Sequence, residues 1–250
     1  QKISEIKEVK SCYIFPNMGD GGLSAGAVLG SYFSKNKELK KIKINMYLGS
    51  SCKEINKSSL LNFKLKELEI ENIYKFIAEE LKKNKIFGIF QGRMEFGPRA
   101  LGNRSIICSP QKIEINEILN QKLKRSEFMP FAPCVLAEDF EKYFQSKTSI
   151  EDYKFMTFTC KTKKICDELT PAIVHVDKSA RPQSIFKKDN IFLHNVLTEF
   201  KNLTGIGMLI NTSFNVHEEP IVESYDDAIK SFKESKLDYL VLDKKVFKMI

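Results

Sequence analysis

The chain has 250 residues, of which 42% are hydrophobic and 29% are charged. This length suits one large domain, or one domain and part of another, and the composition excludes a disordered chain. No apolar run approaches the roughly 18 residues that a membrane span needs, so we expect no membrane contact. The chain begins at Gln1 with no signal-peptide pattern, which predicts an internal start within a longer polypeptide.

The net charge is +8, from 40 basic and 32 acidic residues. Much of the basic excess is lysine in short clusters, at residues 35–43 and 161–164. Such clusters are typical of a solvated surface, and they would equally attract an anionic substrate or a nucleic acid. Composition alone leaves both interpretations open.

The six cysteines form no CxxC pair and no spacing typical of a zinc finger. Cys108, Cys134 and Cys160 lie in apolar or strand-like runs, where a free thiol behaves as a small hydrophobic side chain. Because nothing indicates a disulfide framework, the sequence predicts a protein of the reducing cytoplasm.

Residues 12–15 are apolar and predict a short strand, followed by a glycine-rich turn at residues 16–22. The small side chains of residues 23–31 predict a helix packed closely against a sheet. Residues 36–71 are rich in lysine and serine with weak periodicity, which predicts a linker or an excursion. A new unit is expected to begin near residue 72.

Beyond residue 72, helices and strands are predicted in an irregular alternation. Apolar residues recur at helical spacing over residues 73–83, 114–123, 191–200 and 225–235. Strand-like runs cover residues 85–91, 131–136, 155–160, 173–176, 207–210, 239–242 and 246–250. Because no strict strand–helix unit repeats, we predict an α/β fold, or an α+β fold, around a twisted sheet.

The glycine-rich turn Gly19-Asp20-Gly21-Gly22 is the first segment with functional potential. Glycines expose backbone N–H groups to a ligand, and the helix expected after them could cradle a phosphate. Asp20 could also hold a metal ion. A plain turn accounts for the four residues equally well.

Residues 91–105 combine three arginines, Arg93, Arg99 and Arg104, with three glycines directly after a predicted strand. Guanidinium groups bind phosphate and carboxylate oxygens in bidentate geometry, and glycines let a polyanion approach the backbone. The segment therefore predicts an anion-binding loop, although one arginine could instead pair with Glu95.

Basic residues also gather at the end of the helix predicted over residues 114–123. Lys122, Lys124 and Arg125 lie just before the predicted strand at residues 131–136. They could direct cations into a pocket, or simply interact with the negative end of the helix dipole.

Two further polar segments follow predicted strands. His175 and Asp177 alternate, so both could face one ligand, although a histidine satisfied within the core is the simpler interpretation. Ser213 and Asn215 alternate as well, which predicts hydrogen bonds to a phosphate or a carbonyl, unless they only form a tight turn. No adjacent base would make Ser213 a nucleophile.

Four of these segments together resemble one family, the carbamoyltransferases that modify nodulation factors and antibiotics. They are GRMEFGPRALGNRSI at residues 92–106, PFAP at 130–133, HVDKSARPQ at 175–183, and NTSFN with EPIV at 211–215 and 219–222. Their order and spacing are similar to that family over nearly the whole chain. The chain therefore resembles the C-terminal portion of such an O-carbamoyltransferase.

The resemblance implies two parts. Residues 1–71 resemble the end of an actin/hexokinase-like carbamoyl-transfer domain with a linker, and residues 72–250 resemble threonylcarbamoyl-AMP synthase. Family members hold iron in the complete transfer domain, and Asp20 falls at the position of a metal-binding aspartate. The paired histidine ligands of the family, HxxH, have no counterpart here, because all three histidines follow residue 170.

The resemblance also implies the activity. Carbamoyl phosphate and ATP, with Mg²⁺, would form carbamoyl-adenylate, whose carbamoyl group passes to a hydroxyl of a small-molecule or sugar acceptor. The implied catalytic residues are Lys124 and Arg181. The implied ligands of ATP and carbamoyl phosphate are Arg99, Arg104, Arg125, Ser213 and Asn215. This chain would hold the adenylation half.

The segment before PFAP departs from the family pattern, and Ser126 stands at its acidic position with Glu127 one residue later. Many relatives have basic residues where this chain has Leu123 and Met129, and Lys122 or Lys124 could replace the lost cation. The alternative function is therefore a non-catalytic nucleotide- or RNA-binding module of the same fold. A nucleic-acid partner is less favoured, because no basic stripe is interleaved with aromatic residues, and a homodimer is compatible with the sequence.

Overall fold

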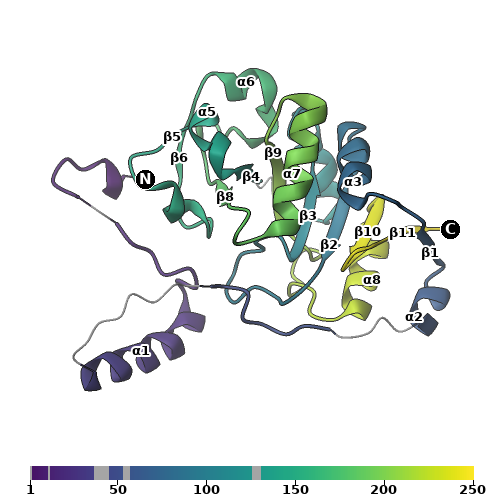
Figure 1. Ribbon diagram of the computed structural model, residues 1–250, viewed down its shortest axis with the longest axis horizontal. Helices are drawn as coiled ribbons and strands as arrows, with labels where there is room; N and C mark the ends of the chain where they lie inside the picture. The colour runs from purple at the N-terminus through teal and green to yellow at the C-terminus, as the bar shows by residue number, and fades with distance from the viewer. Residues whose placement is uncertain (1, 11, 37–44, 53–56, 126–130) are drawn as a thin grey trace.

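The computed structural model describes residues 2–10, 12–36, 45–52, 57–125 and 131–250, and its main element is an eight-stranded twisted sheet (Figure 1). In spatial order the strands are β1 (Leu65–Leu68), β11 (Lys245–Met249), β10 (Tyr239–Leu242), β2 (Phe87–Phe90), β3 (Arg104–Cys108), β9 (Met208–Ser213), β4 (Ala132–Leu136) and β8 (Gln183–Ile185). β2 runs parallel to β10 and β8 parallel to β4, while the other neighbours are antiparallel. The prediction of a mixed α/β fold around a twisted sheet is confirmed.

Helices cover both faces of this sheet. The longer ones are α3 (Ile73–Lys82), α4 (Ile115–Lys122), α7 (Ile191–Thr204) and α8 (Tyr225–Glu234). Alternate residues of β2 point to opposite faces. Phe87 packs its ring 6.4 Å from that of Phe76 on α3, whereas Phe90 lies 4.9 Å from Tyr225 on α8. The helices α3 and α8 therefore lie on opposite faces, and α7 lies beside α3 (Figure 1).

Local side chains fix where these helices begin and end. The side chains of Asn72 and Asn190 each accept a hydrogen bond from the N–H three residues later, which caps α3 and α7. Ser224 and Asp227 form a reciprocal capping box at the start of α8. The left-handed Gly205, with φ of 76°, ends α7.

The remaining elements are short. The strands β5 (Phe144–Gln145), β6 (Cys160–Thr162) and β7 (Ser179–Ala180) form a second sheet. The other α-helices are α1 (Leu23–Lys35), α2 (Lys57–Asn62), α5 (Phe140–Tyr143) and α6 (Ile165–Leu169). Turns of 3₁₀-helix cover Ile3–Glu5, Asp20–Gly22, Ala137–Asp139, Ile150–Tyr153 and Pro171–Ile173. No helix within the described ranges is both long and apolar enough to cross a bilayer.

Three predicted strands are wrong. Residues 12–15 form no strand, residues 173–176 are a 3₁₀-turn followed by a loop, and only Cys160 of residues 155–160 is in a strand. In the last segment Met156 and Phe158 are nevertheless buried. Their apolar character reflects core packing from an irregular chain, which periodicity alone does not separate from a buried strand.

The region before β1 packs differently from the rest of the chain. The helix α1 forms as predicted, but no residue of it is buried, so the expected close packing against a sheet is wrong within the described residues. The strand β1 pairs with β11 although it lies inside the predicted linker. The division at residue 72 stays a prediction, as do the likeness of residues 72–250 to threonylcarbamoyl-AMP synthase and that of the first part to an actin-like domain.

Candidate functional site

The segment with three arginines forms a loop between β2 and β3, which we call the arginine loop (residues 91–104). It lies at one end of the main sheet. The register places the start of β4, the start of β8 and the end of β9 at the same end. The fold thus gathers four residues that are far apart in the sequence at this end of the sheet: Arg99, Arg125, Arg181 and Ser213.

A buried carboxylate shapes the arginine loop. Glu95 is only 6% exposed, and its Oε1 accepts hydrogen bonds from the backbone N–H groups of Leu101, Asn103 and Arg104, at 2.6, 2.8 and 3.3 Å. Burial raises the pKa of this carboxyl group above its usual value, against the effect of these donors. Within the described residues Glu95 makes no ion pair, so it holds the loop through the backbone and not through an arginine side chain.

Arg104 is fully buried, and its terminal nitrogens are engaged, while its Nε has no hydrogen-bond partner among the described residues. Its guanidinium carbon lies 3.5 Å from the centre of the Phe90 ring. The terminal nitrogens donate to four backbone carbonyls, those of Gln91, Asn103, Gly92 and Ser50, at 2.8, 3.0, 3.2 and 3.5 Å. Burial is the largest influence on the pKa of this guanidinium and lowers it. The predicted role of Arg104 as a ligand of ATP or carbamoyl phosphate stays a prediction, and in this structure its terminal nitrogens bind backbone carbonyls.

Arg99 and Arg181 differ from Arg104, because none of their guanidinium nitrogens donates a hydrogen bond within the described residues. The Nε of each is buried and has no hydrogen-bond partner among the described residues. Burial, and secondarily the positive charge of Arg99, lowers the pKa of Arg181 to about 10. Two guanidinium groups close enough to interact electrostatically are unfavourable unless an anion offsets their charge. Their chemistry is that of an anion-binding site.

Arg125 and Lys124 are neighbours in sequence but point to different surroundings. Arg125 donates from Nη2 to Thr212 Oγ1 at 3.1 Å and lies over the ring of Phe131, where burial lowers its pKa. Lys124 has a side chain that is 60% exposed, with its Nζ 3.7 Å from a carboxylate oxygen of Glu234 on α8. The structure therefore brings Arg125 to the edge of β9, whereas Lys124 faces α8.

The polar residues after β9 are partly engaged. Ser213 is the last residue of β9 and is half-buried, with no hydrogen bond from its hydroxyl among the described residues. Asn215 donates from Nδ2 to the carbonyl of Glu219 at 2.7 Å, which closes the turn after the strand. Ser213 is free to meet a ligand, while Asn215 shapes the loop.

His175 and Asp177, for which the sequence left open a shared ligand or a histidine satisfied within the core, meet at Ser179. The Ser179 hydroxyl donates to Asp177 Oδ1 at 2.6 Å and lies 3.5 Å from His175 Nδ1. Burial, followed by the charge of Arg181, lowers the pKa of His175, while Asp177 acts in the opposite direction. His175 is therefore within electrostatic reach of Arg181.

Two other predicted positions lie apart from this edge. Asp20 is exposed, and no group of three His, Cys, Asp or Glu side chains suited to a metal gathers in the described part of the chain. These residues alone do not fit an iron centre, so the metal role of Asp20 stays a prediction. Leu123 is fully buried in the core, and Met129 falls outside the described residues, as do the rest of residues 126–130.

Sequence reasoning missed a segment that completes the arginine loop. Residues 45–50, here called the docked segment, pair through the backbone with Met94 and Phe96. Arg93, predicted only as one of the three arginines of an anion-binding loop, donates to two carbonyls of the docked segment. No pattern in the sequence signals this contact, because it joins a stretch expected to be a linker to a loop more than forty residues away.

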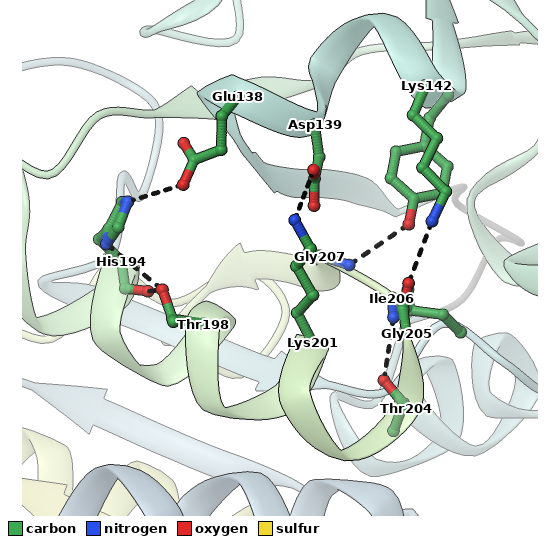
Figure 2. A network of polar contacts seen from close by, with 11 residues as sticks. Glu138, Asp139, Lys142, His194, Thr198, Lys201, Thr204, Gly205, Ile206 and Gly207 are labelled. Carbon is green, nitrogen blue, oxygen red and sulfur yellow. Dashed lines mark hydrogen bonds and ion pairs between the residues drawn. The ribbon is translucent and has the colours of Figure 1, made fainter.

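The other end of the sheet holds charges that are paired (Figure 2). Lys201 Nζ lies 2.7 Å from Asp139 Oδ1, and His194 Nε2 lies 3.2 Å from Glu138 Oε1. A side chain at Gly207 would come within 2.1 Å of Asp139 Oδ2, so this close approach requires glycine. This end is built as a structural network between α7 and the turn after β4.

Comparison with known proteins gives a consistent family. A family model described as Carbamoyltransferase C-terminus matches residues 78–249. The chain is 38% identical over 248 residues to an uncharacterised protein of Methanocaldococcus jannaschii, covering 96% of this chain and 47% of that protein. It is 34% identical over 236 residues to the nodulation protein NolO of Bradyrhizobium diazoefficiens, covering 92% and 43%. The chain thus spans less than half the length of these relatives.

The structure also resembles a solved one, full-length HypF in its phosphate- and nucleotide-bound form. The TM-score is 0.51 at 22% sequence identity, and the similarity covers 69% of this chain and 25% of that chain. At this identity the similarity establishes a shared fold and nothing finer.

Proposed function

The chain belongs to the carbamoyltransferase C-terminus family, and from that premise we propose that it binds carbamoyl phosphate and ATP and forms carbamoyl-adenylate. In the complete protein the carbamoyl group would then pass to a hydroxyl of a small-molecule or sugar acceptor. The single observation that carries the proposal is the pair Arg99 and Arg181, with buried Nε atoms that lack a partner among the described residues.

The charge of the substrates explains why such a pair is useful. Carbamoyl phosphate and the triphosphate of ATP bring several negative charges to one place, and fixed cations must offset them. Arg99 and Arg181 would bind phosphate oxygens, and Arg125 would add a third cation from the edge of β9. Because these guanidinium groups already carry the cost of burial, a bound anion would relieve it.

The reaction would run in two stages. Water hydrolyses carbamoyl phosphate to carbamate and inorganic phosphate, and a carbamate oxygen then attacks the α-phosphorus of ATP, so that pyrophosphate leaves. The arginines would stabilise the charge that grows on the phosphate oxygens, and the free hydroxyl of Ser213 would orient the carbamate by a hydrogen bond. Mg²⁺, when it arrives with ATP, supplies further charge neutralisation. No step is drawn through iron, because the described residues do not form a site for it.

A protein with a similar fold binds ligands of the classes that the proposed reaction uses. HypF was solved with phosphate and a nucleotide bound to it. Two anionic ligands of the same classes are what the proposed reaction requires.

The test is the exchange of labelled pyrophosphate into ATP. We expect exchange that depends on carbamoyl phosphate and that disappears when carbamoyl phosphate is replaced by inorganic phosphate. Exchange independent of carbamoyl phosphate would point to another acid substrate. Its absence, both in this chain and in a full-length protein that contains it, would refute the proposal.

A second function, ligand binding without turnover, has one observation in its favour. The family resemblance implies a basic residue where this chain has Leu123, which is fully buried in the core and offers no charge. This alternative predicts that ATP binds, as measured by calorimetry, while no carbamoyl-adenylate forms. A nucleotide-binding module of this kind and the proposed enzyme are therefore separated by the same exchange assay.

A further inference from the structure

The docked segment (residues 45–50) is held against the arginine loop as if it were an additional strand. The backbone N–H of Gly49 donates to the Met94 carbonyl at 2.9 Å, and the N–H of Met94 donates to the Ser50 carbonyl at 2.8 Å. The N–H of Phe96 donates to the Met46 carbonyl at 2.6 Å. These bonds satisfy the backbone of the loop on the side that the main sheet leaves open.

Two arginines reinforce this pairing from the side of the loop. Arg93 donates from Nε to the carbonyl of Gly49 at 3.0 Å and from Nη2 to that of Leu48 at 2.5 Å. Arg104 reaches the carbonyl of Ser50 with the same guanidinium that binds three carbonyls of the loop itself. A planar fork that binds carbonyls on two segments at once is suited to fixing their relative position.

The docked segment also contacts the loop beyond Arg99. The hydroxyl of Tyr47 donates to the carbonyl of Leu101 at 3.0 Å, and Asn190 donates to the same hydroxyl at 3.2 Å. Leu101 is in turn bound through its N–H to Glu95. Arg99 thus lies on a short span between Glu95 and Leu101, and both of its ends are fixed.

We propose that Arg93 and Arg104 are positioning residues, which fasten the docked segment to the arginine loop and thereby set the place of Arg99. In this role both guanidinium groups act through the backbone carbonyls that they bind. The effect on substrate rests on the proposed function, because it requires that Arg99 binds phosphate oxygens. The fastening of the segment does not depend on that function and can be measured alone.

The test uses Arg93→Met in the whole chain, because Arg93 is exposed and its replacement should not prevent folding. Hydrogen exchange at Gly49 and Met94 should become at least about tenfold faster, since one side of the clamp is gone. The affinity for pyrophosphate, used as the probe anion, should fall by about three- to tenfold with an unchanged unfolding midpoint. A purely structural residue would move the midpoint instead.

Two further variants separate position from charge. Tyr47→Phe removes the hydroxyl that contacts Leu101 without changing any charge, and it should also weaken pyrophosphate binding. Lys112→Met removes one positive charge elsewhere on the surface, and it should change neither the hydrogen exchange at Gly49 and Met94 nor the affinity for pyrophosphate. Unchanged hydrogen exchange at Gly49 and Met94 in Arg93→Met overturns the proposal. So does weakened binding in Lys112→Met equal to that in Arg93→Met, since charge alone would then explain it.

The failure of the proposed function would look different. If the wild-type chain binds no pyrophosphate and shows no carbamoyl-phosphate-dependent exchange, the proposed function fails. Faster hydrogen exchange in Arg93→Met would still establish the clamp in that case. If the wild type binds pyrophosphate, and Arg93→Met opens the segment without loss of affinity, the positioning role is wrong while the proposed function stands.

Discussion

The two ends of the main sheet handle buried charge in opposite ways. At one end, Lys201 pairs with Asp139, and the ring of His194 contacts Glu138, so each carboxylate has a partner close by (Figure 2). At the other end, Arg99 and Arg181 have buried nitrogens without a partner among the described residues, and burial, followed by the charge of Arg99, lowers the pKa of Arg181.

This difference distinguishes stability from function. A paired charge at the boundary of the core contributes to folding, and removing one partner leaves the other uncompensated. Unpaired like charges instead weaken the folded state, and folded proteins tolerate them where a ligand supplies the missing counter-charge. Variants at the two ends should therefore fail in different assays.

Arg181→Ala should have the largest effect. We expect carbamoyl-phosphate-dependent pyrophosphate exchange to fall by about a hundredfold or more, because a donor to the reacting phosphates is lost. The free energy of unfolding should stay the same or rise, since a buried guanidinium without a partner is removed. Exchange assays and urea unfolding measure the two quantities. Lys187→Ala, the same charge change on an exposed side chain, is the control and should affect neither.

Lys201→Met should give the reverse pattern. It leaves the nearly buried Asp139 carboxylate without its cation, which should lower the free energy of unfolding by about 1–3 kcal/mol. The rate of pyrophosphate exchange per folded molecule should stay within about twofold of wild type, because this end of the sheet contacts no proposed ligand. Adding Asp139→Asn to Lys201→Met should recover part of the lost stability. If Lys201→Met instead reduced exchange as strongly as Arg181→Ala, the separation of the two ends would be wrong.

Much of this contrast was accessible from the sequence, but only as residue types. The arginine-rich loop was predicted after a strand, and the strand does end at Phe90. The helices α3, α7 and α8 were predicted from their apolar spacing, because each presents one apolar face to a sheet. Tertiary contacts decide that the terminal nitrogens of Arg104 bind backbone carbonyls while those of Arg99 bind none among the described residues. No local pattern contains that information.

The wrong predictions have the same physical origin. Residues 155–160 were predicted as a strand from apolar content, but Phe158 is buried from an irregular segment. The docked segment was predicted as part of a linker, because polar and lysine-rich stretches rarely pack. Its backbone nevertheless pairs with Met94 and Phe96, and backbone pairing leaves little trace in side-chain composition.

Variants of the neighbouring residues Lys124 and Arg125 test whether only the one that reaches β9 affects pyrophosphate exchange. Lys124 lies near Glu234 on the surface, so in Lys124→Ala we expect exchange to fall by less than about threefold and the free energy of unfolding to change by at most about 1 kcal/mol. Arg125→Ala, the matched variant next to it, should reduce exchange clearly more, because Arg125 reaches the edge of β9. The same exchange assay compares them. A larger loss in Lys124→Ala would restore the catalytic role that the family resemblance implies for it.

The smallest expected effect is on the protonation of His175. Its pKa is lowered from the usual 6.5, first by burial and then by the charge of Arg181. Because the folded pKa lies below the unfolded one, the stability contributed by neutral His175 is present above about pH 6.5 and is lost as pH falls through the folded pKa.

Arg181→Gln removes one of the two causes that lower the pKa of His175, so this pKa should rise by a fraction of a unit and the loss of stability in acid should shrink. An NMR titration of the imidazole measures the first, and urea unfolding on both sides of that pH measures the second. An unchanged His175 pKa would mean that the unpaired charge of Arg181 does not reach this loop, and the cationic end of the sheet would then be confined to the arginine loop itself.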